Sequence, residues 1–348
     1  MTESNSFFVE LEANSQRLFH LLDCFEHPKI LVVGDLALDE FVTGEVERLS
    51  REAPVLILRH EKTSQIPGGG ANAVYNLAKL GAKVQVAGIV GDDPQGEALK
   101  GIFVKAGVGI EGIITEPDRP TVTKTRISGH ARQSVTQQIV RLDRKSDFPP
   151  HSDCISQIAI FVKESISKVD AVVCSDYGDG VFSPSVVNAT LAHNRAIVDT
   201  QSNLSRYLGA MVFTPNLPEA EKAVGYSINN ETLLQQAGKD LLTLTEAEYI
   251  LLTRGEEGMS LFSKTGEVHH IPPFNRTDVF DVTGAGDTVV AAFTISLCAG
   301  ATAWEASVLG NLAASIVVRQ FGTATTDIEA MKLGLQAILD DPSLLQIN

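Results

Sequence analysis

Cysteine, basic residues and long apolar runs are all scarce in this sequence. The four cysteines, Cys24, Cys154, Cys174 and Cys298, match the spacing of neither a zinc site nor a disulfide framework. With 28 basic against 43 acidic residues, the formal charge of −15 argues against binding to nucleic acid or an anionic membrane. The longest apolar run, around 289–299, is too short for a bilayer, which needs about 20 residues. Because the N-terminus also lacks a secretion signal, we expect a soluble cytoplasmic protein.

Short apolar segments alternate with stretches of helical length along most of the chain. They are rich in Val and Ile and bounded by Gly, Asp or Asn: 30–33, 84–90, 171–174, 196–198, 211–213 and 249–252. This pattern favours an α/β fold, with a mostly parallel central sheet flanked by helices on both faces. Such sheets bind ligands beyond the carboxyl ends of their strands, so Asp35, Asp176, Asp199 and Thr253 are expected to face a binding site.

Two stretches depart from this pattern, and a third precedes it. Residues 41–66 and 110–141 alternate apolar and polar side chains with period 2, which predicts antiparallel strands with one wet face. We expect them to form a small β-sheet lid over the site. An apolar helical stripe predicts that residues 1–28 form an added helix packed on a single domain of residues 29–348.

The most specific motif is Asp281-Val-Thr-Gly-Ala-Gly-Asp287, followed by an apolar helical run. The small residues Gly284, Ala285 and Gly286 would let an anion approach the free N–H groups at the start of that helix. Asp287 lies in the first turn, where the helix dipole favours its ionised form. An anion-binding turn beside a carboxylate base suits phosphoryl transfer. By composition alone, a glycine-rich turn with an acidic helix start is the commoner interpretation.

The motif resembles the second signature of the ribokinase-like, or PfkB, carbohydrate kinases. The string Pro67-Gly-Gly-Gly-Ala-Asn72 resembles their first signature, and the resemblance extends from about Lys29 to about Ala337. It implies the ribokinase-like fold and an ATP-dependent sugar kinase that uses Mg²⁺. A dinucleotide-binding fingerprint, which Gly68-x-Gly70-x-x-Ala73 also fits, should follow a strand directly, whereas a polar stretch and Pro67 precede it here.

The resemblance assigns roles to individual residues. It implies Gly284, Ala285, Gly286 and Asp287 as the catalytic group, and Asp39, Gly69, Gly70 and Asn72 as sugar ligands. It implies a nucleotide site at Asn216, Glu219, Thr253, Gly255 and Asn311, with Glu219 ordering Mg²⁺ through water. Asp281 and Thr283 are candidate ligands of a monovalent cation such as K⁺. Taken singly, Asn216 and Glu219 also fit a helix capping box, and Asn72 a helix cap.

Basic side chains gather in one part of this acidic chain. Residues 119–145 contain seven of them and one acid, Asp143. Lys124 and Arg126 alternate onto one strand face, and together with Arg141 they could bind a phosphate already present on the sugar. The alternative is protection of an edge strand, because charged side chains discourage strand pairing.

Five segments resemble one branch of the family, the kinases that phosphorylate D-glycero-D-manno-heptose 7-phosphate at carbon 1 for lipopolysaccharide precursors: 48–55, 123–126, 137–143, 175–178 and 214–219. Asp179 stands where that branch usually has lysine, and Gln201-Ser202 lacks the lysine usual there. In some bacteria the kinase is fused to a nucleotidyltransferase with a His-x-Gly-His motif. This sequence contains none, so we expect the stand-alone kinase.

Other interpretations stay open. The same fold could phosphorylate another sugar, a sugar phosphate or a nucleoside. It could also bind a sugar or nucleotide without catalysis, because fold does not imply function. In this family one lid often pairs with another, so a homodimer through the lid is expected.

Overall fold

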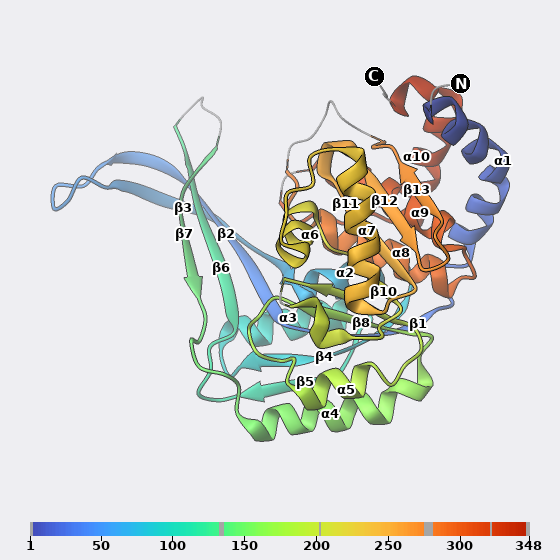
Figure 1. The fold of residues 1–348 in the computed structure, drawn as a ribbon. Helices are drawn as coiled ribbons and strands as arrows, with labels where there is room; N and C mark the ends of the chain where they lie inside the picture. Colours follow the sequence, from blue (N-terminus) through green and yellow to red (C-terminus); the bar gives the residue numbers. More distant parts are fainter. Residues whose placement is uncertain (1–2, 132–135, 202, 275–280, 321, 346–348) are drawn as a thin grey trace.

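A nine-stranded sheet forms the centre of the computed structural model, which describes residues 3–131, 136–201, 203–274, 281–320 and 322–345 (Figure 1). The strand order is β13-β12-β11-β10-β9-β8-β1-β4-β5. The strands are β1 (Lys29–Gly34), β4 (Lys83–Gly91), β5 (Gly109–Glu116), β8 (Ala171–Asp176), β9 (Ala196–Thr200), β10 (Val212–Phe213), β11 (Tyr249–Thr253), β12 (Met259–Ser263) and β13 (Val268–Ile271). Neighbours from β5 to β11 are parallel, whereas β12 and β13 pair antiparallel. The mostly parallel sheet predicted from the sequence is confirmed.

Helices cover both faces of this sheet. One face packs against α1 (Glu3–Asp23), α2 (Gly70–Lys79), α3 (Pro94–Lys105), α8 (Ala285–Cys298), α9 (Ala303–Val317) and α10 (Ile328–Asp340). The other packs against α4 (Ser152–Ser165), α5 (Pro184–Thr190), α6 (Leu217–Val224) and α7 (Glu231–Thr245). Because successive strand side chains point to opposite faces, Val32 lies in the first core and Leu31 and Val33 in the second. Short 3₁₀ turns lie at Ile166–Lys168, Leu204–Tyr207, Gly255–Glu257 and Pro342–Leu345.

A second, four-stranded sheet extends away from the body as a lid (Figure 1). Its strand order is β3-β2-β6-β7, from β2 (Leu36–Leu49), β3 (Leu56–Gly69), β6 (Val122–His130) and β7 (Gln137–Arg144). The prediction that the lid begins at residue 110 was wrong, because Gly109–Glu116 forms β5 and pairs with β4. β5 contacts both α4 and α3, and its mixture of apolar and polar side chains resembles the alternation of a lid strand. β2 and β6 also run parallel rather than antiparallel.

The predicted N-terminal helix is present as α1, which lies beside α10 (Figure 1). Its apolar stripe is buried, with Leu11, Leu18 and Leu22 fully inaccessible to solvent. Phe7 packs against Phe274 and Trp304, with ring centroids 6.0 and 6.2 Å away. None of the described helices is long and apolar enough to span a membrane.

The N-terminus of α8 lacks the side-chain cap that several other helices have. Side chains cap α3, α7 and α10, where Asp93, Asn230 and Asp327 each accept a backbone N–H of the first turn. At α8 the N-cap residue is Gly284, which has no side chain and adopts a φ of 79°. The Ala285 N–H donates to the Val282 carbonyl at 3.2 Å, and no side chain caps the N–H groups that follow it.

Candidate active site

The Asp287 carboxylate is held from both sides in the first turn of α8. The side chain is buried, with 5% of the residue exposed. The Asn72 amide donates to Oδ2 at 2.9 Å, and the Tyr177 hydroxyl donates to Oδ1 at 2.9 Å. These donors come from α2 and from the loop after β8, so three distant segments meet at one carboxylate.

Burial sets the protonation of this carboxylate. It raises the pKa of Asp287 from its ordinary 3.8 to about 6, although the hydrogen bonds from Asn72 and Tyr177 lower it. Desolvation outweighs these two hydrogen bonds, so the net shift of the pKa is upward. A carboxylate with a pKa near 6 is ionised at neutral pH and is still basic enough to accept a hydroxyl proton.

A chain of polar side chains joins the two glycine-rich signatures. Asn72 Oδ1 accepts from the Asn76 amide at 3.0 Å, and the Thr288 hydroxyl donates to Asn76 Oδ1 at 3.1 Å. A Cβ on Gly284 would lie 2.5 Å from Asn72 Nδ2, so this approach of α2 to α8 needs glycine. Asn72 was predicted as a sugar ligand, and its amide here is bonded to Asp287.

Two of the three glycines of the first signature shape the turn between β3 and α2. Gly69 has a φ of 52°, and the Gly70 N–H donates to the Asp35 carbonyl at 3.0 Å. A Cβ on Gly70 would lie 3.0 Å from that same carbonyl oxygen. Glycine therefore lets the start of α2 approach the end of β1.

A cavity of about 480 Å³ lies beside the start of α8. Its wall is mainly apolar and includes Met259, Pro273, Phe274, Val282, Val289, Ala314 and Val318, together with the predicted Thr253, Gly255, Ala285, Gly286 and Asn311. The Asn311 amide donates to the Pro272 carbonyl at 2.6 Å, which fixes it on that wall. An apolar cavity with a few fixed polar groups suits a flat heterocycle such as adenine.

A smaller, acidic cavity of about 120 Å³ adjoins the first, and Thr253 and Gly286 line both. Its lining includes four carboxylates, Asp176, Asp199, Glu219 and Asp287. Burial, then the neighbouring carboxylates of Asp287 and Glu219, raise the pKa of Asp199 well above its usual range. The described residues that line the two cavities include no lysine or arginine, and Gln201 stands on the acidic one.

The negative charge of this cavity fits a divalent cation. No three acidic, His or Cys side chains of the described residues converge closely enough to hold a metal by themselves. Mg²⁺ keeps several waters and takes phosphate oxygens as ligands, so it would be held jointly with a nucleotide. Asn216 and Glu219 form the capping box of α6, with bonds of 2.9 Å each, and Glu219 still lines the cavity. Asn216 and Glu219 therefore both cap α6 and line the acidic cavity.

On the lid side, Asp39 of β2 pairs with Arg126 of β6 at 2.6 Å. A Cβ on Gly68 would lie 2.7 Å from the Asp39 carboxylate. Glycine at this position of the first signature therefore leaves room for the Asp39 side chain. The Lys124 ammonium lies 5.8 Å from the centroid of the Tyr177 ring. These groups meet at the base of the lid, on the Asp287 side.

The predicted basic cluster divides into groups with different partners. Arg119 is buried and donates at 2.6 Å to the Phe148 and Asp179 carbonyls, so it holds loops together. Arg141 pairs with Asp143, and 48% of its side chain is exposed. Arg132 lies outside the described residues. A phosphate clamp at this position therefore depends on Lys124 and Arg126.

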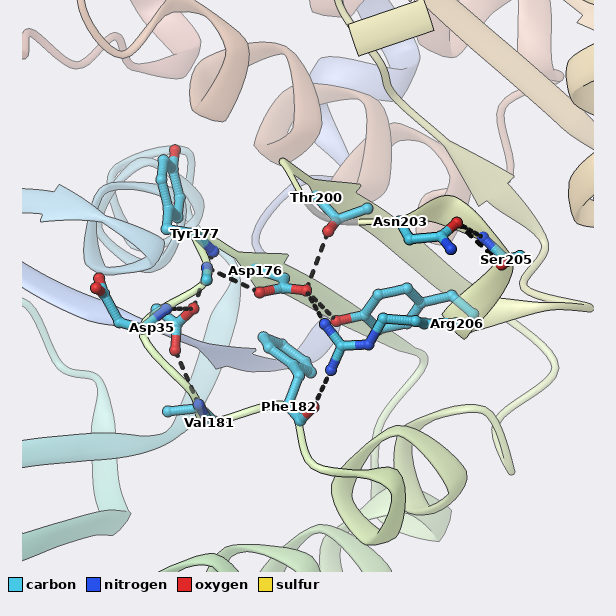
Figure 2. Close-up of polar contacts among 12 residues, drawn as sticks. Asp35, Asp176, Tyr177, Val181, Phe182, Thr200, Asn203, Ser205 and Arg206 are labelled. Atoms are coloured by element: carbon cyan, nitrogen blue, oxygen red, sulfur yellow. Dashed lines mark hydrogen bonds and ion pairs between the residues drawn. The ribbon is translucent and has the colours of Figure 1, made fainter. Parts of the chain in front are cut away.

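Two acidic side chains accept backbone N–H groups. The prediction that Asp35 faces the site was wrong, because its carboxylate accepts N–H groups of the loop after β8 (Figure 2). Asp281 accepts the N–H groups of Thr283 and Gly322, at 2.9 and 3.1 Å. Partial burial raises the pKa of Asp281, but these hydrogen bonds outweigh burial and the net pKa is lowered.

Tyr177 is the site residue that the sequence did not identify. The sequence did contain one indication, because Tyr177 directly follows Asp176 at the end of β8, the edge of the sheet where ligands bind. A single tyrosine after an acidic strand end is common, so nothing in the pattern indicated a bond to a carboxylate more than 100 positions away.

The architecture is the ribokinase-like fold. The chain is similar to Arabidopsis thaliana ribokinase complexed with ribose and ATP, with a TM-score of 0.66, 20% identity and coverage of 92% of this chain and 99% of that one. It is also similar to Escherichia coli phosphofructokinase-2 in complex with potassium, with a TM-score of 0.70, 19% identity and coverage of 90% and 99%. At these identities the likeness establishes the fold.

The family follows from the sequence comparison. The model of the pfkB family carbohydrate kinases matches residues 27–331, so the chain belongs to this family of phosphotransferases that act on a sugar hydroxyl. It is 41% identical over 318 residues to the bifunctional protein HldE of Desulfatibacillum aliphaticivorans, covering 90% of this chain and 64% of the relative. For the HldE of Geobacter metallireducens the values are 42% over 301 residues, 85% and 60%. The chain thus spans about three fifths of the length of these relatives.

Proposed function

We propose that this protein transfers the γ-phosphate of ATP to the C1 hydroxyl of D-glycero-D-manno-heptose 7-phosphate, giving the 1,7-bisphosphate. The observation that carries the proposal is the buried Asp287 carboxylate between the base of the lid and the acidic cavity. The identity of about 40% to HldE proteins supports the heptose branch.

The nucleotide is assigned to the two adjoining cavities. The adenine would occupy the apolar cavity beside Asn311, and the phosphates would run past Thr253 and Gly255 to the start of α8. There the amides that follow Gly284 would stabilise the charge that develops on the transferred group. Mg²⁺, when bound near Glu219, would neutralise phosphate charge. Burial raises the pKa of both Asp199 and Glu219, so a bound cation would favour their ionised forms.

The sugar is assigned to the base of the lid. Its C1 hydroxyl would lie against Asp287, which accepts the hydroxyl proton as the C1 oxygen forms a bond to the γ-phosphorus. The bond between that phosphorus and the departing ADP oxygen breaks in the same displacement. Asp39, Gly69, Gly70 and Asn72 would contact sugar hydroxyls. The lid would exclude water, which suppresses hydrolysis of ATP.

Lys124 and Arg126 would bind the 7-phosphate, with Arg141 from the neighbouring strand completing the clamp. The register pairs Arg126 with Arg141 across β6 and β7, so the two guanidinium groups arise side by side. Arg126 is already paired with Asp39, however, and Lys124 rests near the Tyr177 ring. That prior neutralisation of Arg126 favours a second candidate substrate, a sugar without a phosphate.

A substrate panel with coupled detection of ADP separates the two. We expect kcat/KM for heptose 7-phosphate to exceed that for unphosphorylated heptose, and Lys124→Ala to remove most of the difference. Lys62→Ala is the matched control, because Lys62 is an exposed lysine of the same lid. Equal kcat/KM for both sugars, unaffected by Lys124→Ala, would reject the heptose 7-phosphate assignment.

Three further assignments accompany this function. Exposed apolar side chains on the lid, Leu49, Val55, Leu56, Ile139, Val140 and Leu142, support a homodimer in which two lids pack together. Light scattering at micromolar concentration that returned a mass of 37.3 kDa would reject the dimer.

Activity in K⁺ compared with Na⁺ tests the monovalent-cation site at Asp281 and Thr283. The four free cysteines support action in the reducing cytoplasm.

A further inference from the structure

We propose that Tyr177 is a positioning residue for this phosphotransfer. Its hydroxyl holds the base Asp287, and its ring supports Lys124, the residue assigned to the phosphorylated end of the sugar. The proposal rests on the proposed function, because it assigns Tyr177 to the same site.

The hydroxyl of Tyr177 donates a hydrogen bond to the Asp287 carboxylate, the proposed base. It lies 2.9 Å from Asp287 Oδ1, while the Asn72 amide occupies Oδ2. Burial, then the charges of Asp287 and Asp199, raise the pKa of Tyr177 well above its usual range. The hydroxyl therefore stays protonated wherever Asp287 is ionised. Both donors together fix the plane of the carboxylate.

The ring of Tyr177 faces two other parts of the site. The Lys124 ammonium lies 5.8 Å from the ring centroid, within range of a cation–π contact. A Cβ on Gly69 would lie 3.7 Å from the ring edge, so the ring also rests against the first signature. One side chain therefore touches the base, the lid lysine and the turn that precedes α2.

The backbone of Tyr177 is anchored independently of any substrate. The Asp35 carboxylate accepts the N–H groups of Tyr177, Asp179 and Val181, at 2.9, 3.0 and 3.1 Å. Figure 2 shows this carboxylate under the loop, with the Tyr177 ring extending away from it. Asp35 is almost fully buried and faces no cavity described above, which leaves support of the loop as its function in the structure.

A second carboxylate holds the start of the same loop. Asp176 accepts the Gly178 N–H at 3.0 Å, the Thr200 hydroxyl at 3.0 Å and the Tyr207 hydroxyl at 2.7 Å (Figure 2). Arg206 contributes an ion pair at 3.2 Å. Two strand-end carboxylates thus fix the loop on which Tyr177 stands, and such a rigid frame is what a positioning residue requires.

The charges around Asp287 determine what loss of the hydroxyl would do. Among the described residues, Asp39 from β2, Lys124 from β6, Tyr177 from the loop after β8 and Asp199 from β9 act on Asp287. Asp176 from β8 and Glu219 from α6 line the same acidic cavity. The carboxylates oppose ionisation of Asp287, whereas Lys124 and the two hydrogen-bond donors favour it. Removing one donor shifts the balance in one direction, so the pKa of Asp287 should rise.

The first test is Tyr177→Phe, which deletes one oxygen and keeps the ring. We expect the acidic limb of kcat/KM to move up by about one pH unit, and kcat on the plateau to fall about tenfold. KM for the sugar phosphate should change little, because the ring still supports Lys124. The substrate phosphate titrates near the same pH, but it does so equally for every variant, so the difference between variants isolates Asp287.

Two companion variants separate positioning from general damage. Tyr177→Leu removes the ring as well, so it should also raise KM for the phosphorylated sugar several-fold more than for the unphosphorylated sugar. Tyr226→Phe is the matched control, because its hydroxyl donates to Asp240 at 2.7 Å, between α6 and α7 and outside the site. The acidic limb of kcat/KM for Tyr226→Phe should coincide with that of wild type.

An acidic limb of Tyr177→Phe that coincides with wild type would overturn the proposal. A second readout does not depend on the substrate: titration of carboxyl-¹³C aspartate by NMR in wild type and Tyr177→Phe. The Asp287 resonance, assigned with Asp287→Asn, should titrate at higher pH in Tyr177→Phe. If wild type phosphorylates none of the sugars, the proposed function fails, and this titration still decides whether Tyr177 controls Asp287.

Discussion

Replacing Asp287 by asparagine tests the catalytic assignment and its energetic cost together. The substitution keeps the shape of the side chain and removes its ability to accept a proton. General-base catalysis contributes about 10²- to 10⁴-fold, so kcat should fall by that factor. ATP affinity, measured by titration calorimetry, should stay nearly unchanged, because the apolar cavity beside Asn311 is untouched.

The same substitution should spare or increase stability. Burial raises the pKa of Asp287 from 3.8 to about 6. In the folded state the ionised form is therefore disfavoured by about 3 kcal/mol, a penalty fully present above pH 6 and absent below about pH 4. Asparagine removes the penalty but accepts at one oxygen, so one donor, Asn72 or Tyr177, loses its partner at a cost of about 1–3 kcal/mol. The free energy of unfolding at pH 8 should thus equal or exceed that of wild type by up to about 2 kcal/mol.

Urea denaturation at two pH values checks this balance. At pH 4 the wild-type carboxyl is already protonated, so the advantage of Asp287→Asn over wild type should disappear or reverse. The coupled ADP assay supplies the rates for the same samples. A variant with near-wild-type kcat would refute the base assignment. A variant destabilised at pH 8 by clearly more than the cost of one unpaired donor would refute the buried-charge argument.

Three other outcomes follow from the site geometry. Wild-type kcat/KM should decline as pH falls through about 6, because Asp287 becomes protonated, and a limb centred near 4 would contradict its burial. Gly284→Ala should lower kcat at least tenfold, since its Cβ would lie 2.5 Å from the Asn72 amide that holds Asp287; a wild-type rate would show that this contact is not needed. Phe7→Ala should cost about 3 kcal/mol of unfolding free energy and raise KM for ATP but not for the sugar, because Phe7 packs on Phe274 of the apolar cavity; equal effects on both KM values would reject that support.

Local patterns in the sequence were sufficient for most of the architecture and for the two signatures. Strand segments such as 30–33 and 171–174 are buried on both faces, so an unbroken run of Val and Ile identifies them. The start of α8 was predictable because the full string from Asp281 to Asp287, followed by an apolar helical run, is far more specific than a lone pair of glycines. The predicted boundary of the lid was wrong at residues 109–116. The edge strand β5 and a lid strand both mix apolar and polar side chains, and they differ in the strand with which they pair.

The chain itself determined the order of strands and helices, the two glycine-rich signatures and the family, because each depends on residues adjacent in sequence. Tertiary structure alone decided the pKa of Asp287, since burial is a property of the assembled site and here outweighs the hydrogen bonds from Asn72 and Tyr177. It also decided that Asp35 supports a loop, that Arg119 joins loops, and that the Tyr177 hydroxyl donates to Asp287. Those roles depend on partners tens to more than a hundred positions away, which local periodicity does not encode.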